Sequence, residues 1–244
     1  MEADLLKDRI FDTANIAEKS AKPKFLGFLS PEQAVLADKL LSNRGIRYEF
    51  FGGFDNAQRV MLGCLPDWVQ EVKFPITAIT AIFRKSDSLS HRDFLGSLMA
   101  LGLKRETVGD ILVGEGKAVF FVTAETVGYI TSQIEKIGRV GVNLEIGYEL
   151  PLPSVGVLKE FSATVSSERL DCVVGVLANI SRAKACEKIE QSAVSVNSVT
   201  IEKITAHVGE GDVISIRGSG RFIIDSLCDR TRKDRIILKY KKYV

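Results

Sequence analysis

The sequence predicts an α+β protein made of three successive parts. In the middle of the chain, strand-like and helix-like segments follow one another in the order β-α-β-β-α-β. A mixed helical region precedes them, and a pair of short helices followed by alternating strand segments comes after them. Pro151, Pro153 and Gly156 mark a linker between the middle part and the last part.

The bulk composition is that of an ordinary globular protein. Of the 244 residues 45% are hydrophobic and 26% charged, and the formal net charge is only +2, which excludes a disordered polycation. A near-neutral total still allows a local basic face, and cations are in clear excess between Ser226 and Val244. We therefore expect an N-terminal helical region with a short hairpin over 1–72, a central domain over 73–150, a C-terminal module over 157–225 and a basic extension over 226–244.

The N-terminal region is expected to be mixed helical. Ser30 can cap a helix whose first position is occupied by Pro31, a residue that suits that place. The pair Gly52-Gly53 marks a turn between two short strands. The expected elements are helices over 3–19 and 30–43 and strands over 48–51 and 59–62.

The central segment has the element order that is typical of ferredoxin-like domains, a fold that many RNA-recognition modules use. Ser90 can cap its first helix, and Asp93 stands where a capping box needs an acceptor. Gly114 and Gly116 favour a hairpin turn between the two middle strands. The expected elements are strands over 76–84, 110–113, 117–122 and 139–146 and helices over 90–101 and 124–137.

The C-terminal module begins with an amphipathic helix, because Leu170, Val173, Val174 and Leu177 recur at helical spacing. Ser181 can cap a second helix by accepting from its free N–H groups. Two alternating segments, 193–197 and 213–217, then predict strands, and the turn Gly211-Asp212 precedes the second of them.

The second helix of this module has an apolar side and a basic side. Ala185, Cys186 and Ile189 share the inner side, whereas Lys184 and Lys188, four residues apart, share the outer side with Ser181. Cations near a helix N-terminus, where free amides also point outward, form a site suited to phosphates. This arrangement indicates an anion-binding surface.

These residues resemble the S4-like RNA-binding domain, which is named after a small-subunit ribosomal protein. The residues that carry the resemblance are Arg169-Leu170-Asp171, Ser181-Arg182, Ala185, Ile189, Val194-x-Val196-Asn197, Gly211-Asp212 and Arg217-Gly218-x-Gly220-Arg221-Phe222. They span nearly the whole module. Ala193 and Ser198 stand where the family usually has glycine, which changes turn geometry without removing an RNA contact. The resemblance implies a two-helix motif beside a small β-sheet that binds structured RNA.

Across its full length the chain resembles the YlmH family of bacterial proteins with an S4-like domain. The resemblance is carried by the segments 47–54, 91–99 and 105–113. It implies an N-terminal helical segment, a central RNA-binding-like domain and the S4-like module. It also implies links to cell-division gene neighbourhoods and to ribosome-associated quality control, with rRNA and tRNA on a stalled large subunit as partners. Related cyanobacterial and plastid proteins are linked to photosystem assembly, although no transit peptide is recognisable at the start of this sequence.

The main expected phosphate contacts are Lys184 and Lys188, although Glu187 and Glu190 can instead pair with them and leave a solvated helix face. Arg182 either bridges Asp171, contacts RNA, or does both. Other candidates lie at strand ends and turns, where loop residues reach a ligand. The full expected set of RNA contacts is Arg169, Ser181, Arg182, Lys184, Lys188, Asn197, Arg217 and Arg221.

A second basic patch in the central domain is a further hypothesis, made of His91, Arg92, Lys104 and Arg105. The run His91-Arg92-Asp93 is not interpreted as an acid–base pair, because consecutive helical residues do not share a face and capping explains Asp93. Phe120 or Phe121 either offers a stacking surface or packs against the two helices, and core packing is favoured.

No catalytic, cofactor or metal site is expected. The sequence contains no dinucleotide-binding glycine motif, no phosphate-binding loop and no nucleophile elbow. The tripeptide Arg169-Leu170-Asp171 superficially resembles one in pseudouridine synthases, but here it leads into the two-helix motif. The four cysteines are far apart, which favours reduced thiols. No apolar run is long enough to cross a membrane, and the N-terminus lacks a signal-peptide core, so a cytoplasmic location is expected.

The sequence therefore favours a non-enzymatic protein that binds structured RNA, with rRNA, tRNA and the ribosome as partners and no membrane contact. Two alternatives stay open. One is an RNA-modifying enzyme that uses the C-terminal module as an anchor. The other is an adaptor protein in cell division or photosystem assembly, whose basic face is incidental.

Overall fold

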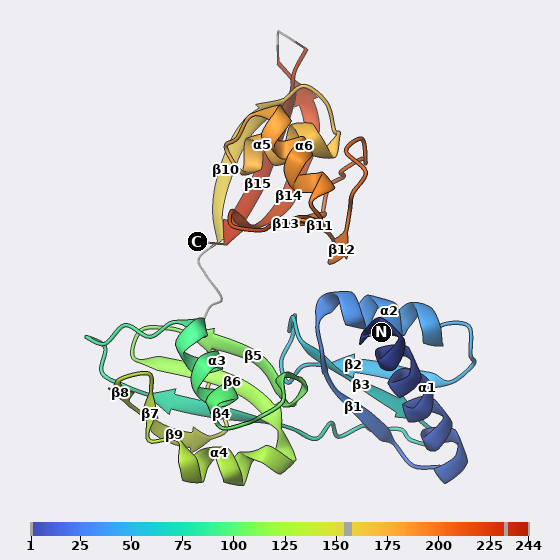
Figure 1. Ribbon diagram of the computed structural model, residues 1–244, viewed down its shortest axis with the longest axis vertical. Helices are drawn as coiled ribbons and strands as arrows, with labels where there is room; N and C mark the ends of the chain where they lie inside the picture. The colour runs from blue at the N-terminus through green and yellow to red at the C-terminus, as the bar shows by residue number, and fades with distance from the viewer. Residues whose placement is uncertain (1, 154–157, 232–233, 244) are drawn as a thin grey trace. The chain divides into compact units, whose positions relative to one another are not determined.

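The computed structural model describes residues 2–153, 158–231 and 234–243 and has the α+β composition that the sequence predicts (Figure 1). The chain divides into two compact units, Met1–Ser154 and Val155–Val244, which we call unit 1 and unit 2. Neighbouring strands in each sheet are antiparallel. Within the described residues, none of the helices combines the length and hydrophobicity that crossing a bilayer requires.

Unit 1 begins with two helices packed on a three-stranded sheet of order β1-β3-β2. The elements are α1 (Glu2–Ser20), β1 (Lys24–Leu29), α2 (Pro31–Leu41), β2 (Arg47–Phe51) and β3 (Val60–Leu65). Ile10, Ala14 and Leu41 from the helices meet Leu26 and Leu62 from the sheet in one core cluster. Ser30 caps α2 as predicted, in a capping box with Gln33.

The expectation of helices with only a hairpin was wrong for the N-terminal region, because it missed strand β1. Gly27 weakens the strand signal in its sequence. That glycine is needed for a tertiary reason, since a Cβ there would lie 2.6 Å from the carbonyl oxygen of Glu106. Strand β1 was therefore missed because the close approach of its backbone to Glu106 requires a glycine, which is unusual in a strand.

The central part of unit 1 has a four-stranded sheet of order β5-β6-β4-β9. The elements are β4 (Ile76–Ile82), α3 (His91–Ala100), a short 3₁₀ turn η1 (Arg105–Thr107), β5 (Val108–Val113), β6 (Lys117–Thr123), α4 (Val127–Gln133), β7 (Lys136–Ile137), β8 (Val140–Gly141) and β9 (Asn143–Ile146). Phe94 and Leu98 of α3 and Ile130 of α4 pack against Phe120 of the sheet. Ser90 and Asp93 form the predicted capping box.

The last predicted helix of this part is shorter than expected. It ends at Gln133 because Ile134 takes an extended conformation, and a small β7–β8 hairpin follows in place of the last helical turn. Ile134 and Ile137 are both buried in the core that α3 and α4 share. Burial of two β-branched side chains in extended backbone outweighs the helical pattern of the preceding residues.

Unit 2 is a six-stranded sheet of order β10-β15-β14-β13-β11-β12, with two helices against one face (Figure 1). The elements are β10 (Leu158–Val165), α5 (Leu170–Leu177), α6 (Arg182–Glu190), β11 (Val194–Val196), β12 (Val199–Thr200), β13 (Val213–Ile216), β14 (Gly220–Arg230) and β15 (Ile236–Tyr243). The predicted stripe of α5 is buried in its core, together with Ala185, Ile189 and Phe222.

The C-terminal segment, expected to be a basic extension, belongs to this sheet. Strand β15 lies between β10 and β14 and pairs with both. Ile236 and Leu238 are buried on the helix side, whereas Lys239 is exposed on the other. The cations of β15 thus share a strand with core residues. The expectation of a solvated tail was wrong because it rested on the number of cations alone.

Candidate nucleic-acid interface

The N-terminus of α6 is built as the sequence predicts. The Ser181 hydroxyl accepts a hydrogen bond from the Lys184 N–H at 3.3 Å, which caps the helix. Ala185 and Ile189 are fully buried, so the opposite side of the helix carries Lys184 outward, and Lys184 is exposed. An exposed lysine side chain therefore lies in the first turn of a capped helix, where an anion is favoured.

Lys188, one turn further along α6, is half-buried and tied to another element. Its Nζ donates to the carbonyl oxygen of Arg217 at 3.0 Å, which holds α6 against the turn between β13 and β14. Arg217 itself is exposed. The structure thus brings Lys188 of α6 to the backbone of Arg217, although the two residues lie far apart in sequence.

A buried carboxylate joins the starts of the two helices. Asp171 is only 1% exposed, and it accepts hydrogen bonds from Arg169 at 3.1 Å and from Arg182 at 2.7 Å. Burial alone raises the pKa of Asp171, but the hydrogen bonds and charges of the two arginines outweigh this and leave its pKa below the ordinary value. The bridge to Asp171, one of the roles left open for Arg182 by the sequence, is therefore present.

The bridge to Asp171 leaves both arginine side chains partly exposed, 37% for Arg169 and 59% for Arg182. One negatively charged carboxylate pairs with two positively charged guanidinium groups. Each guanidinium has five N–H donors in a planar fork. The cluster therefore keeps a net positive charge and outward donors, which is compatible with both roles considered for Arg182.

Asn197 lies at the other end of β13 from Arg217. Its side chain donates to Asp212 at 2.7 Å and accepts from the Val213 N–H at 2.9 Å, so it fixes the turn that leads into β13. Arg221 is half-buried on β14 opposite Ser215. The predicted residues thus fall into separate groups. One is Arg169 and Arg182 around Asp171, the second is Ser181, Lys184 and Lys188 on α6 with Arg217, and the third is Asn197 with Asp212.

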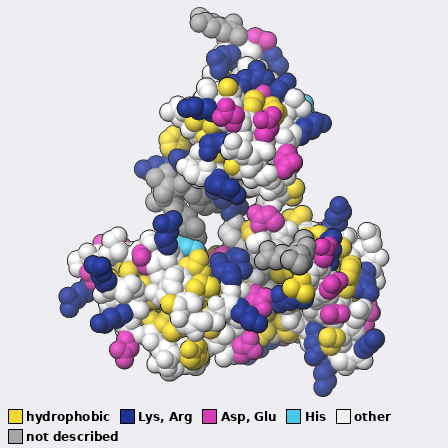
Figure 2. Space-filling model, in the orientation of Figure 1, with side chains coloured by type: hydrophobic (Ala, Val, Ile, Leu, Met, Phe, Trp, Pro, Cys, Tyr) yellow, Lys and Arg dark blue, Asp and Glu magenta, His cyan; other side chains and the backbone are white. Residues whose placement is uncertain are grey.

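The surface around these groups is mixed in charge. Figure 2 shows Lys and Arg side chains interspersed with Asp and Glu on the face of unit 2 that carries α5 and α6. Glu187 and Glu190 on α6 are exposed beside the lysines. The candidate interface is therefore a set of local cationic groups and not a uniformly basic face, as the net charge of +2 suggests.

The second patch in unit 1 is partly engaged in internal contacts. His91 and Arg92 are exposed at the start of α3, and Lys104 is exposed before η1. Arg105 is half-buried and donates to the carbonyl oxygen of Val108. Burial and the nearby Arg105 charge lower the pKa of His91, while Asp110 acts in the opposite direction. His91 therefore lies within electrostatic reach of Arg105 but contributes little positive charge at neutral pH.

Sequence reasoning missed the residues that join the two halves of unit 1. The Asp110 carboxylate accepts the backbone N–H groups of Gln58 at 2.5 Å and of Arg59 at 3.1 Å. Arg59 donates to the carbonyl oxygens of Phe28 and Val108 at 2.8 and 3.0 Å. Burial lowers the pKa of Arg59 to about 10, which still leaves it charged at neutral pH. Of the segments singled out by the family resemblance, 105–113 carries Val108 and Asp110 of this junction, whereas Gln58 and Arg59 lie just beyond the segment 47–54.

The aromatic residues of the central sheet are both in cores. Phe120 packs with Phe94 on the helix side, as favoured from sequence. Phe121 faces the other way and stacks on Phe54 of the N-terminal part, with ring centroids 4.8 Å apart and an interplanar angle of 23°. It is 1% exposed. The face that an RNA-recognition sheet would offer to bases is therefore covered here by the protein's own N-terminal part.

Other chemistry finds little support in the described residues. Among them, no group of three or more His, Cys, Asp and Glu side chains is placed to hold a metal ion. Cys64, Cys172 and Cys186 are free. Burial raises the pKa of the Cys64 thiol to about 11, so this group stays protonated and unreactive at neutral pH.

Comparison with known proteins gives a consistent set of matches. Residues 70–148 match a family model described as "Putative RNA-binding domain in YlmH". The Ribosome-associated protein quality control protein P2 of Bacillus subtilis (strain 168) is 32% identical over 233 residues, covering 93% of this chain and 90% of that protein. A solved structure, the cell division protein ylmH from Streptococcus pneumoniae, is 26% identical with a TM-score of 0.53, over 61% of this chain and 92% of that chain.

Proposed function

Because the chain belongs to the YlmH family, we propose that it binds structured ribosomal or transfer RNA on the ribosome and catalyses no reaction. The curated relative is named a ribosome-associated quality control protein, and the matched family model describes an RNA-binding domain. The same relationship supports a proposed role in translation quality control in the cytoplasm.

The observation that carries this proposal is the exposed ammonium group of Lys184 beside the capped N-terminus of α6. Lys188, one turn further along α6, donates to the backbone of the exposed Arg217, and Arg169 and Arg182 beside Asp171 add two partly exposed guanidinium groups. Such point charges contact phosphates and fix orientation without reading sequence. RNA would then be recognised by shape and backbone, as structured RNA generally is.

The fold assignments support the same function. We assign unit 2 to the S4-like class, with β10 and β15 added to its small sheet. We assign the central sheet to the ferredoxin-like class, because its strand order β5-β6-β4-β9 with two helices on one face is the order that this class requires. Its aromatic face is covered, so an RNA contact there would use the patch of His91, Arg92, Lys104 and Arg105 at the helix end.

The double variant Lys184→Glu/Lys188→Glu tests the proposal. We expect it to stop co-sedimenting with ribosomes while its thermal unfolding stays close to that of the wild type. Lys19→Glu/Lys39→Glu is the matched control, because both lysines are exposed on unit 1 and the change in net charge is the same. Unchanged sedimentation of the first variant, or equal loss in both, contradicts the assignment of α6.

A role in cell division is the second candidate, favoured by the name of the pneumococcal protein. Purification of the chain at low and high salt separates the two. Co-purifying nucleic acid that is released at high salt favours RNA, because phosphate contacts weaken steeply with salt. A protein partner retained at high salt, without nucleic acid, favours the adaptor.

A further inference from the structure

The face of the central sheet that carries Phe121 is covered only in part. Lys117 lies on the same face of β6 as Phe121, because side chains an even number of residues apart share a face. Ile82 of β4 pairs with Lys117, and Glu145 of β9 pairs with Thr80 on this face. The N-terminal part covers Phe121, whereas Ile82 stays exposed. One corner of the face, formed by β4, β6 and β9, is therefore open.

This corner forms a hollow of about 490 Å³ with an apolar lining. Ile82, Ile146 and Tyr148 line it and are 42%, 68% and 39% exposed. The ring of Tyr148 meets that of Phe121 edge-on, with centroids 5.7 Å apart, so it borders the part that the N-terminal cover reaches. Large apolar side chains exposed together in one place are typical of a surface that another protein contacts.

The charged residues that line the hollow make it acidic. Glu145 and Glu149 are exposed, whereas Lys117 is half-buried. The two carboxylates repel phosphate groups, so RNA is disfavoured here. A partner that carries cationic side chains is favoured by the same charges.

Strand β9 is an edge of its sheet, and its register shows which backbone groups face outward. The Gly147 N–H donates to the carbonyl oxygen of Ala78 at 2.8 Å, and bonded and non-bonded pairs alternate along antiparallel strands. The backbone groups of Leu144 and Ile146 therefore point away from β4, at the open side of the four-stranded sheet. An edge of this kind can pair with an added strand.

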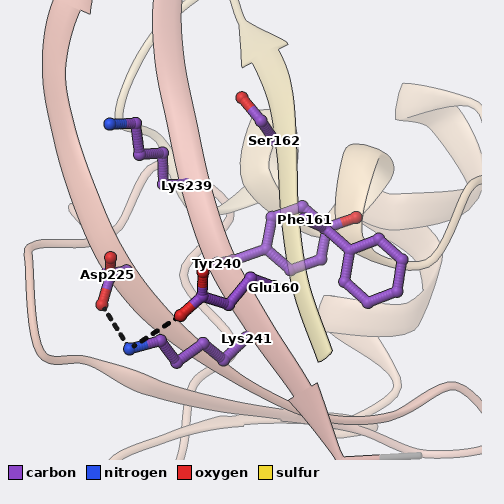
Figure 3. A pocket seen from close by; sticks show the side chains of 7 residues that line it. All are labelled: Glu160, Phe161, Ser162, Asp225, Lys239, Tyr240 and Lys241. Carbon is purple, nitrogen blue, oxygen red and sulfur yellow. Dashed lines mark ion pairs between the residues drawn. The ribbon is translucent and has the colours of Figure 1, made fainter. Parts of the chain in front are cut away.

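The edge of unit 2 at β10 differs in both respects. Lys241 lies between Asp225 at 3.0 Å and Glu160 at 3.6 Å, so the carboxylates beside this edge already have a cation (Figure 3). Arg235 donates to the carbonyl oxygen of Thr164 at 2.9 Å, which occupies one backbone acceptor of β10. The edge at β9 is therefore the better candidate for a partner.

We propose that β9 accepts, as an added strand, an extended segment of a protein partner in which basic and aliphatic residues alternate. The register gives this alternation, because Glu145 lies on one face of β9 and Leu144 and Ile146 lie on the other. Residues of the added strand that lie beside Glu145 are basic, and those beside Leu144 and Ile146 are aliphatic, since cross-strand neighbours on one face interact.

The basic residues of the added strand also fill the hollow. Their aliphatic stems cover Ile82 and Tyr148 while their charged ends reach Glu145 and Glu149. The inference goes beyond the proposed RNA binding and does not rest on it, because it uses neither unit 2 nor a phosphate.

The test measures the binding of three labelled synthetic peptides to the full chain by fluorescence anisotropy, after ribonuclease treatment. One peptide alternates lysine and valine, the second contains the same residues as a lysine block and a valine block, and the third alternates glutamate and valine. We expect the alternating basic peptide to bind on the order of tenfold more tightly than the other two, because only this peptide, as a strand, places cations beside Glu145 and valines beside Ile146.

Variants of the hollow and of the strand edge test the two parts of the proposal. Glu145→Lys/Glu149→Lys should bind the alternating acidic peptide more tightly than the basic one. Glu18→Lys/Glu125→Lys is the matched control, because both glutamates are exposed on unit 1 and the change in net charge is the same; it should keep the wild-type order. Ile146→Pro removes an outward N–H donor, a change that an edge strand tolerates, and should weaken binding of the basic peptide.

A second measurement needs no substitution. Hydrogen exchange followed by NMR should show that the N–H groups of Leu144 and Ile146 exchange more slowly when the alternating basic peptide is bound. The Glu145 N–H, which already bonds to β4, should be unchanged. Equal binding of the three peptides, the wild-type order in Glu145→Lys/Glu149→Lys, or unchanged exchange at Leu144 and Ile146 overturns the proposal.

Discussion

Asp171 shows how one residue can organise the candidate interface. It links the start of α5 to α6 by accepting from Arg169 and Arg182, and both arginines keep part of their surface for a ligand. From the sequence, a bridge from Arg182 to Asp171 was one of the roles left open for that arginine, and the structure shows the bridge. The contact of Arg169, two residues before Asp171 at the start of α5, was not predicted.

We predict that Asp171→Asn lowers the free energy of unfolding by about 2–4 kcal/mol near neutral pH, because it leaves two arginines without their buried counter-charge. The folded pKa of Asp171 is below the unfolded value, so its stabilisation is present above about pH 4 and is lost as the pH falls through the folded pKa. Urea unfolding at several pH values should therefore show that the difference in free energy of unfolding between wild type and variant becomes smaller in acid.

Asp225→Asn is the control for Asp171→Asn. It loses only a partly exposed pair with Lys241 and should change stability little. A difference between wild type and Asp171→Asn that grows in acid contradicts this account.

Ser198 occupies a position for which glycine is better suited. Asn197 and Ser198 connect β11 to β12 with φ values of 49° and 66°, in the left-handed region. Two-residue hairpin turns of this kind favour Asn-Gly. We predict that Ser198→Gly stabilises the protein by about 0.5–1 kcal/mol, measured by thermal unfolding. Ser195→Gly, within strand β11, should destabilise it instead, and a loss of stability in Ser198→Gly would show that the turn is held by other contacts.

At the scale of elements, a helix or strand could be predicted when the residues that define it are close together in the sequence. Capped helices such as α2, α3 and α6 were predicted because the cap and the apolar stripe are written within a few residues. Strand β10 was not predicted, because it is defined by pairing with β15, more than seventy residues away. Strand β15 was mistaken for an extension, because the excess of cations in its segment suggests a solvated tail.

The same limit applies to the placing of single side chains. Lys184 and Lys188 could be placed on one helix face from spacing alone. Phe161 and Tyr240 stack only when β10 pairs with β15. A basic tail and an isolated phenylalanine carry no mutual signal in the sequence, so this contact could not be predicted.

The junction between the two halves of unit 1 gives a prediction at this scale. Arg59 is half-buried and satisfies carbonyl oxygens from β1, η1 and β5. Arg59→Met should lower the free energy of unfolding by about 2–3 kcal/mol, because these acceptors lose their donor in a partly buried site. Arg92→Met, at an exposed position on α3, serves as the control. Equal stability of the two variants in urea would mean that Phe54, Phe121 and their neighbours hold the halves together without the arginine.

At the scale of the whole molecule, unit 1 and unit 2 each offer a modest cationic surface. Two weak sites on one chain raise the effective concentration of the second once the first is bound. A net charge of only +2 is therefore compatible with tight RNA binding, provided that the charges lie at the points of contact. Local charge placement, and not total charge, is the property that the proposed function requires.

The most direct test of that function is the salt dependence of binding to purified ribosomal RNA, measured for the wild type and for Lys184→Ala. We predict that the logarithm of the binding constant falls linearly with the logarithm of salt concentration, and that the variant lowers the slope by about one unit with a similar loss for every RNA tested. A slope that is the same in both proteins would show that the Lys184 ammonium group meets no phosphate. That result would contradict the proposed role of α6.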